Sequence, residues 1–179
     1  MRICLLMLFA SLMVACASAP KYQYAVEPTP LKAESTQYAI ESVEVNLILG
    51  HGAREGDTRF NTEAKITETF TQALTQALQE YGALADAEAA DADLNIVVDF
   101  VRKYNTGGKA LNTPQVSHKV IASRGEQELA VFGLESYTLE YGIYDQMKIA
   151  GFKRGNDEEL ADIKRLAQLM ADDIVQMGR

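Results

Sequence analysis

The chain has 179 residues, 47% of them hydrophobic, and its 17 Lys and Arg against 25 Asp and Glu give a formal net charge of −8. This composition is typical of a folded protein. The acidic balance disfavours nucleic-acid binding, because phosphate recognition needs a basic face. It also disfavours peripheral attraction to anionic lipid.

Residues 1–20, MRICLLMLFASLMVACASAP, have the layout of a secretory signal. Arg2 gives a positive start, the stretch Ile3 to Val14 is apolar, and small residues follow it. An apolar run of about a dozen residues is too short to span a bilayer comfortably as a helix. We therefore expect export across a membrane.

Two cleavage sites and one uncleaved form are compatible with this leader. Met13-Val14-Ala15-Cys16 resembles the lipobox of bacterial lipoproteins, with Met in the place of the usual Leu. The resemblance implies diacylation of the Cys16 thiol, cleavage before Cys16 and acylation of the freed amine, so that acyl chains hold the protein on a membrane. An ordinary signal-peptidase site between Ala15 and Ala19 is the alternative, and an uncleaved anchor is the third. The lipoprotein form predicts a signal peptide over residues 1–15.

Both cysteines, Cys4 and Cys16, lie at or before the proposed cleavage point. An exported domain without cysteines must be held together by an ordinary hydrophobic core. We expect this core in a single periplasmic α/β domain over residues 38–179.

Residues 16–37 are expected to form the lipidated N-terminus and a tether. Three of the four prolines of the chain lie here, and each favours extended backbone. Part of this segment has an alternative, in which Tyr22, Tyr24 and Val26 pack on the domain. The sequence leaves both open.

Residues 38–49, YAIESVEVNLIL, alternate apolar and polar side chains and predict the first strand. The glycine-rich stretch 50–58 that follows has the spacing Gly50-x-Gly52-x-x-x-Gly56, which misses the dinucleotide fingerprint and lacks a P-loop Lys. A surface loop is the favoured interpretation. Residues 61–81 predict a helix, begun by Asn61 or Thr62 and ended by Gly82. Its apolar stripe is Ile66, Phe70, Ala73, Leu74, Ala77, Leu78 and Tyr81.

The acidic stretch 83–93 lacks the glycine and the closing Glu of an EF-hand, which favours a solvated turn over a calcium site. Residues 94–104 predict the second strand, and 115–144 predict further antiparallel strands with a hairpin turn at 123–126. Residues 156–177 predict the closing helix, with Asn156 and Glu159 as a capping-box-like start. The fold class is thus α/β (α+β). We expect a two-layer sandwich, with a mainly antiparallel sheet of about four to five strands and two long helices on one face.

Catalytic and cofactor constellations are missing from the sequence. The two histidines, His51 and His118, have no second ligand at zinc spacing, and no serine lies in a nucleophile-elbow motif. His118 alternates with Val116 and Val120, which favours a packed or hydrogen-bonded histidine on a strand. We therefore predict no catalytic residue, no metal site and no cofactor, and Cys16 as the one modification site.

The order of elements resembles that of small Gram-negative envelope lipoproteins. These include accessory lipoproteins of ABC-type lipid transport systems, lipoprotein activators of penicillin-binding proteins and the periplasmic domain of the curli secretion channel. In these families a helix ending in Gly precedes an Ala-Asp-x-Leu strand entry, to which Ala92-Asp93-Leu94 after Tyr81-Gly82 is similar, without the intervening residue. The resemblance implies a domain that binds protein partners and catalyses nothing.

We therefore expect a lipid-anchored, non-enzymatic accessory or assembly factor that binds an envelope protein partner, with its oligomeric state open. Ala17 and Ser18 follow Cys16 where enterobacterial lipoproteins retained in the inner membrane carry Asp, which implies the outer membrane, facing the periplasm. The alternative function is a periplasmic carrier of lipid or another small ligand, held between helices and sheet.

Overall fold

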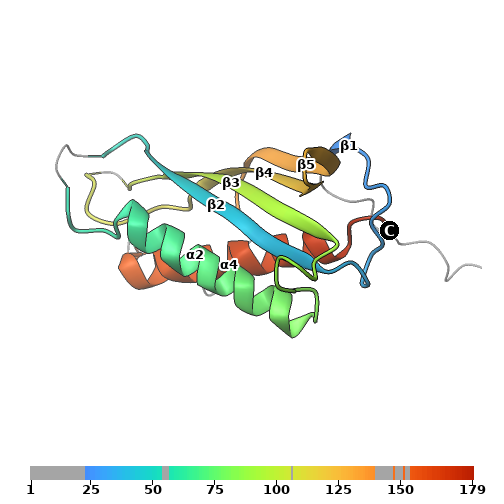
Figure 1. Ribbon diagram of the computed structural model, residues 1–179. Coiled ribbons are helices and arrows are strands. Elements are labelled where there is room, and N and C mark those ends of the chain that lie inside the picture. The colour runs from blue at the N-terminus through green and yellow to red at the C-terminus, as the bar shows by residue number, and fades with distance from the viewer. Residues whose placement is uncertain (1–22, 54–56, 106, 140–146, 148–150, 152–153) are drawn as a thin grey trace, which may run out of the picture.

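A computed structural model describes residues 23–53, 57–105, 107–139, 147, 151 and 154–179. These residues form a mixed α/β fold with one five-stranded sheet and two long helices (Figure 1). The elements in chain order are β1 (Gln23–Val26), β2 (Tyr38–Leu49), α2 (Glu63–Glu80), β3 (Ala92–Arg102), β4 (Gln115–Arg124), β5 (Gln127–Tyr137) and α4 (Asn156–Val175).

The strands lie in the order β1-β5-β4-β3-β2. β2 and β3 are parallel, so the chain must cross over between them, and α2 supplies the crossover. The pairings β1–β5, β5–β4 and β4–β3 are antiparallel. This topology confirms the expectation of a mostly antiparallel sheet with both long helices present.

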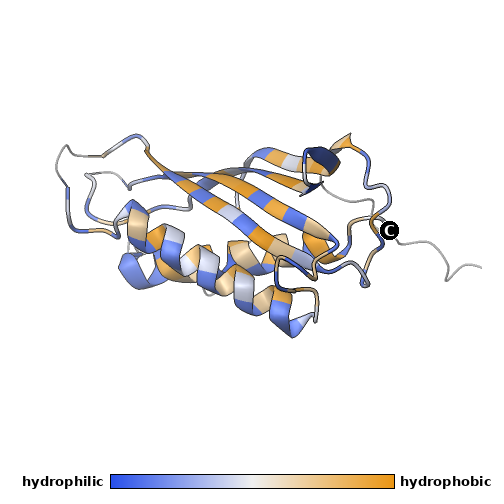
Figure 2. Cartoon of the chain, viewed as in Figure 1, coloured by the Kyte–Doolittle hydropathy of each residue, from blue (hydrophilic) through white to orange (hydrophobic). Residues whose placement is uncertain are grey.

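The core follows the alternation of the strands. In β3 the side chains of Leu94, Ile96, Val98 and Phe100 are all buried, while the residues between them are more exposed. Figure 2 shows the corresponding alternation of hydrophobic and hydrophilic residues along the strands. The largest fully buried side chains are Tyr38, Phe70, Phe100, Phe132, Ile66, Leu74, Leu78, Leu94, Ile96, Ile163, Leu166 and Met170.

Helix α2 has the ends that the sequence predicts. The Thr62 side chain accepts from the Lys65 backbone N–H at 3.2 Å as the N-cap, and Gly82 follows the helix with a φ of +64°. Tyr81 departs from the expected apolar stripe, because it is 48% exposed. Its hydroxyl donates to Asp172 of α4, so it links the two helices at their surface.

Helix α4 begins differently from the expectation. The carboxylate that returns to the start of the helix belongs to Glu158, which accepts from the Gly155 N–H at 3.0 Å. Asn156 and Glu159 do not form the predicted cap. The reason is that the Glu159 carboxylate points to Arg102 at the end of β3, as described below.

The segment before β2 packs on the sheet and on α4. β1 pairs with β5, and the Thr29 N–H donates to the Leu129 carbonyl at 3.2 Å. Leu31 is buried in the core cluster, and the Glu34 N–H donates to the Val175 carbonyl at 2.9 Å. Of the two possibilities that the sequence leaves open for this segment, residues 23–37 adopt the packed one.

β4 and β5 form a hairpin whose turn contains Gly125 with a φ of +59°. Of the antiparallel strands expected over residues 115–144, the described residues contain β4 and β5, and β5 ends at Tyr137. Leu139 is buried outside any strand. Residues 140–146 lie outside the described part of the chain.

Candidate functional site

Polar side chains gather where the end of β3 meets the start of α4. Arg102 is the last residue of β3, and Glu159 lies in the first turn of α4. Leu94, Ile96, Val98 and Phe100 point into the core at every second position of β3, and Arg102 continues this alternation. An arginine in the buried phase of a strand needs an anionic partner, because a buried charge without one is costly.

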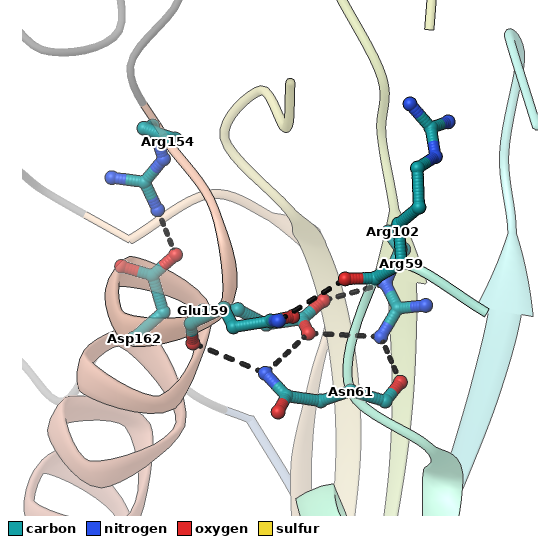
Figure 3. A network of polar contacts seen from close by, with 7 residues as sticks. Arg59, Asn61, Arg102, Arg154, Glu159 and Asp162 are labelled. Atoms are coloured by element: carbon teal, nitrogen blue, oxygen red, sulfur yellow. Dashed lines mark hydrogen bonds and ion pairs between the residues drawn. The ribbon is translucent and has the colours of Figure 1, made fainter. Parts of the chain in front are cut away.

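Arg102 finds this partner in Glu159. Its Nε donates to one carboxylate oxygen at 2.6 Å and its Nη2 to the other at 2.9 Å, with the two side chains 4% and 2% exposed. The same Nη2 donates to the Asn61 carbonyl at 2.6 Å, and the Asn61 amide donates to Glu159 at 3.0 Å (Figure 3). The guanidinium and the carboxylate thus form a bidentate ion pair, which is stronger than a pair joined by a single hydrogen bond.

A second buried ion pair lies beside the first. Arg154 donates to Asp162, and both side chains are almost fully buried. Asp162 follows Glu159 by three positions, so the two carboxylates lie on neighbouring turns of one face of α4. Figure 3 shows both arginines approaching this face of the helix.

An aromatic ring joins this cluster to the loop before α2. The Phe60 ring contacts two guanidinium groups, with its centroid 5.2 Å from the Cζ of Arg59 and 5.7 Å from that of Arg102. Tyr104 meets the Phe60 ring edge-on at 5.7 Å between centroids. Arg59 also donates to the Gly108 carbonyl at 2.7 Å. The cluster therefore holds the loops after β2 and β3 against the first turns of α4.

The arrangement is poorly suited to catalysis. Both carboxylates are held by guanidinium groups, so neither is placed to move a proton to or from a substrate. The cavity that Arg102, Arg154, Glu159 and Asp162 help to line has a volume of about 10 Å³. A single water needs roughly 10 to 15 Å³, so a substrate has no room here. Sequence reasoning missed this cluster, although the arginine in the buried phase of β3 was a usable signal.

His118 is the second site of interest, and it is buried as the sequence indicates. Its Nδ1 lies 2.8 Å from the Tyr137 hydroxyl, and burial lowers the pKa of His118 to about 4. Burial also raises the pKa of Tyr137. Both groups are therefore neutral at pH 7.

A larger and open cavity, of about 490 Å³, lies over the β5–β4 side of the sheet. Gly133 contributes to its lining, and a Cβ there would approach the His118 carbonyl oxygen to 2.3 Å. The backbones of β4 and β5 therefore exclude a side chain at position 133. The lining residues are Ala25, His118, Lys119, Val131, Phe132, Gly133, Leu134 and Glu135.

The remaining residues singled out in the sequence lie apart from these sites. His51 is exposed in the turn after β2. Asp91 of the acidic stretch accepts from the Gln37 N–H at 3.0 Å and so ties that stretch to the start of β2. Among the described residues no group of three or more His, Cys, Asp or Glu is placed to hold a metal. Cys16 and its neighbours lie outside the described residues.

No helix in the described part of the chain has both the length and the apolar character needed to cross a membrane.

No family model matches the chain, and no curated protein matches it. Solved structures match with low identity. A Xanthomonas campestris protein of the family model DUF330 has a TM-score of 0.40 and 13% identity, over 86% of this chain and 90% of its own. PelC from Paraburkholderia phytofirmans, solved as a dodecamer, has a TM-score of 0.38 and 11% identity, over 84% of this chain and 96% of its own. A DUF4136 family protein from Bacteroides thetaiotaomicron has a TM-score of 0.35 and 11% identity, over 84% and 96%. The structural neighbours thus include DUF330 and DUF4136 family proteins.

Proposed function

We propose that the chain is a lipid-anchored envelope protein whose domain acts as a non-enzymatic accessory or assembly factor. The observation that carries this proposal is the pairing of its buried charged residues. Arg102 with Glu159 and Arg154 with Asp162 bond to each other around a cavity of about 10 Å³, which suits a rigid framework better than a catalytic centre. A rigid framework that fixes loops is what a partner-binding domain needs.

The proposal includes a two-layer arrangement with both helices on one face of the sheet. In the view of Figure 1, α2 and α4 lie side by side below the strands. Asn46 of β2 donates to Asp99 of β3 at 3.0 Å. Each of these residues is adjacent in its strand to a buried one, Val45 or Phe100, and so lies on the opposite face of the sheet. The face that carries this pair is then the one that is turned away from the helices.

The anchor would hold the domain close to the membrane surface. β1 begins at Gln23, so the chain between a lipidated Cys16 and the sheet spans at most about 25 Å when fully extended. A longer tether, reaching to residue 37, does not fit the packing of Leu31 in the core. Any partner is then expected to be at or near the membrane that holds the acyl chains.

Labelling with radioactive palmitate tests the anchor. We expect label in the wild type and in Cys4→Ser, and none in Cys16→Ser. Equal labelling of the wild type and Cys16→Ser would contradict lipidation at this residue.

The membrane can be assigned by fractionation. Density-gradient separation of the two membranes should place the wild type in the outer membrane, since Ala17 and Ser18 follow Cys16. Ala17→Asp should move the protein to the inner membrane if the host follows the enterobacterial sorting rule. Recovery of the wild type in the inner membrane would overturn the proposed localisation.

Partner binding is tested by photocrosslinking in cells. A photoreactive residue replaces Leu49, which is 52% exposed at the end of β2, near the loops that the ion pairs fix. The matched control carries the same residue at exposed Gln79, near the end of α2. We expect a discrete adduct with another envelope protein from position 49 and not from position 79. Absence of any adduct from several exposed positions would contradict the partner-binding role.

A carrier of a small ligand is the second candidate, and the open cavity of about 490 Å³ over β4 and β5 favours it. Ligand pockets in proteins commonly have volumes in this range. Native mass spectrometry of the purified protein separates the two functions. A copurifying lipid or small molecule supports the carrier, and a clean apo mass supports the partner-binding factor.

A further inference from the structure

The carboxyl end of β5 has an irregular backbone. Its register with β4 shifts between Val116 and His118, and Ser136 opposite this point has a φ of +57°. This left-handed conformation is uncommon for a residue with a side chain. The Ser136 N–H donates to the Ser117 Oγ at 3.0 Å, and the Gln115 side chain donates to the Ser136 Oγ. The bulge therefore depends on a few specific polar contacts to stay on the sheet.

The bulge also turns Tyr137 into contact with His118. The Tyr137 hydroxyl lies 2.8 Å from the His118 Nδ1, and the two rings meet edge-on with centroids 5.5 Å apart. On its other side the imidazole meets the Phe132 ring edge-on at 6.3 Å. His118 is 8% exposed, and its Nε2 has no hydrogen-bond partner among the described residues. The pair thus ties the last residue of β5 to the interior of β4.

The surroundings of His118 suit a neutral ring and oppose a charged one. A protonated imidazole donates from both nitrogens, yet one hydroxyl is the only polar partner described for it. Val98 stands opposite on β3 and Leu134 opposite on β5. Among the described residues, the titratable groups around the pair include Tyr24 of β1, whose ring meets Phe132 edge-on at 5.9 Å, Tyr137 of β5 and, acting on Tyr137, Asp173 of α4. Lys119 next to His118 on β4 is exposed.

We propose that His118 and Tyr137 form an acid-released latch, in which protonation of His118 frees the end of β5 around Glu135, Ser136 and Tyr137 from the sheet. Leu134 and Glu135 line the open cavity over β4 and β5, so release of this end changes the shape of that surface. The latch is a property of the domain itself. A failure of the latch would not contradict the lipid anchor or the partner-binding role, and the failure of either of these would not contradict the latch.

The size of the response follows from the two protonation states. Burial holds the pKa of His118 at about 4 in the closed state, against 6.5 for an exposed imidazole. The open state therefore takes up the proton first, and acid favours it. These values give a roughly 20-fold increase in the opening equilibrium between pH 7 and pH 5.

Hydrogen exchange followed by NMR tests the latch. Protection factors, which are already corrected for the intrinsic pH dependence of exchange, are measured for the Ser136 amide at pH 7 and pH 5, with the Phe100 amide in β3 as the internal reference. We expect the Ser136 protection factor to be lower than that of Phe100, as a local opening requires, and to fall roughly 20-fold from pH 7 to pH 5. A Ser136 protection factor equal to that of Phe100, or no change at Ser136 between the two pH values, would overturn the proposal.

Two variants separate the latch from general acid sensitivity. His118→Asn keeps a polar group for Tyr137 but does not titrate, so its Ser136 protection factor should be the same at both pH values. Tyr137→Phe keeps the ring but loses the hydroxyl, so Ser136 protection should be low already at pH 7. A wild-type response that persists in His118→Asn, or a Tyr137→Phe variant with wild-type protection, would refute the mechanism.

A direct titration of the wild type keeps the proposal testable even if a variant does not fold. The chain has two histidines, so the ring signals of His118 and of exposed His51 can be followed separately. The His118 signal should titrate well below 6.5, the value of an exposed imidazole. A His118 midpoint near 6.5 would show that His118 is not held neutral, and the latch would be excluded.

Discussion

The Nε and Nη2 of Arg102 lie 2.6 and 2.9 Å from the two carboxylate oxygens of Glu159, although the residues are 57 positions apart in the chain. The pair joins the end of β3 to the first turn of α4, and both side chains are nearly inaccessible to water. A buried pair of this kind is sensitive to the loss of one partner, since the other charge is then left without compensation.

Arg102→Met should therefore destabilise the domain strongly. Removal of one partner of a buried ion pair costs about 3 to 5 kcal/mol, because the Glu159 carboxylate stays buried without its counter-ion. Chemical denaturation measures the loss. The double variant Arg102→Met/Glu159→Leu is the matched control, and it should recover most of the stability, since no charge remains buried. A double variant that is less stable than Arg102→Met would contradict this account.

Phe70→Ala should cost about 3 to 5 kcal/mol of the free energy of unfolding, and Leu74→Ala about 2 to 5 kcal/mol. Both side chains are fully buried on the face of α2 that packs in the core. Gln79→Ala on the exposed side of the same helix should change stability by less than about 0.5 kcal/mol. A loss below about 0.5 kcal/mol for Phe70→Ala would mean that this face of α2 does not pack in the core and is instead a surface for binding another protein.

Leu31→Ala tests whether the segment before β2 belongs to the folded domain. Leu31 is 6% exposed within the core cluster, so its truncation should cost about 2 to 5 kcal/mol. Lys32→Ala next to it should be nearly neutral, because the Lys32 side chain is exposed. Thermal unfolding of the two variants beside the wild type gives the comparison. Equal stability of all three proteins would show that the segment does not pack in solution.

The stability of the domain should fall as the pH falls from about 6.5 to about 4. Burial lowers the pKa of His118 from 6.5 to about 4, so between these values the unfolded chain binds the proton and the folded domain does not. The contribution is fully present above pH 6.5 and lost at lower pH, and it amounts to about 3 kcal/mol at most. Urea denaturation at a series of pH values, with His118→Asn as the control, measures it. The difference between the two curves isolates His118 from the carboxylates.

The local patterns of the sequence determined the elements. The three-and-four spacing of Ile66, Phe70 and Leu74 predicted α2, and Gly82 predicted its end, because helix periodicity and left-handed backbone depend on neighbouring residues alone. Strand alternation likewise predicted β2 and β3 within two residues. The leader pattern around Cys16 predicts export and lipidation in the same local way.

The tertiary structure decided which distant residues meet. The sequence placed Glu159 in a capping box and Tyr81 in an apolar stripe, since both fit the local spacing. In the fold Glu159 neutralises Arg102, Tyr81 bonds to Asp172, and β2 lies parallel to β3. The packing of Leu31 against the core was likewise undecided by its neighbours. These pairings depend on the order and direction of strands, and that order is set by the burial of the whole core at once, which no short stretch of sequence encodes.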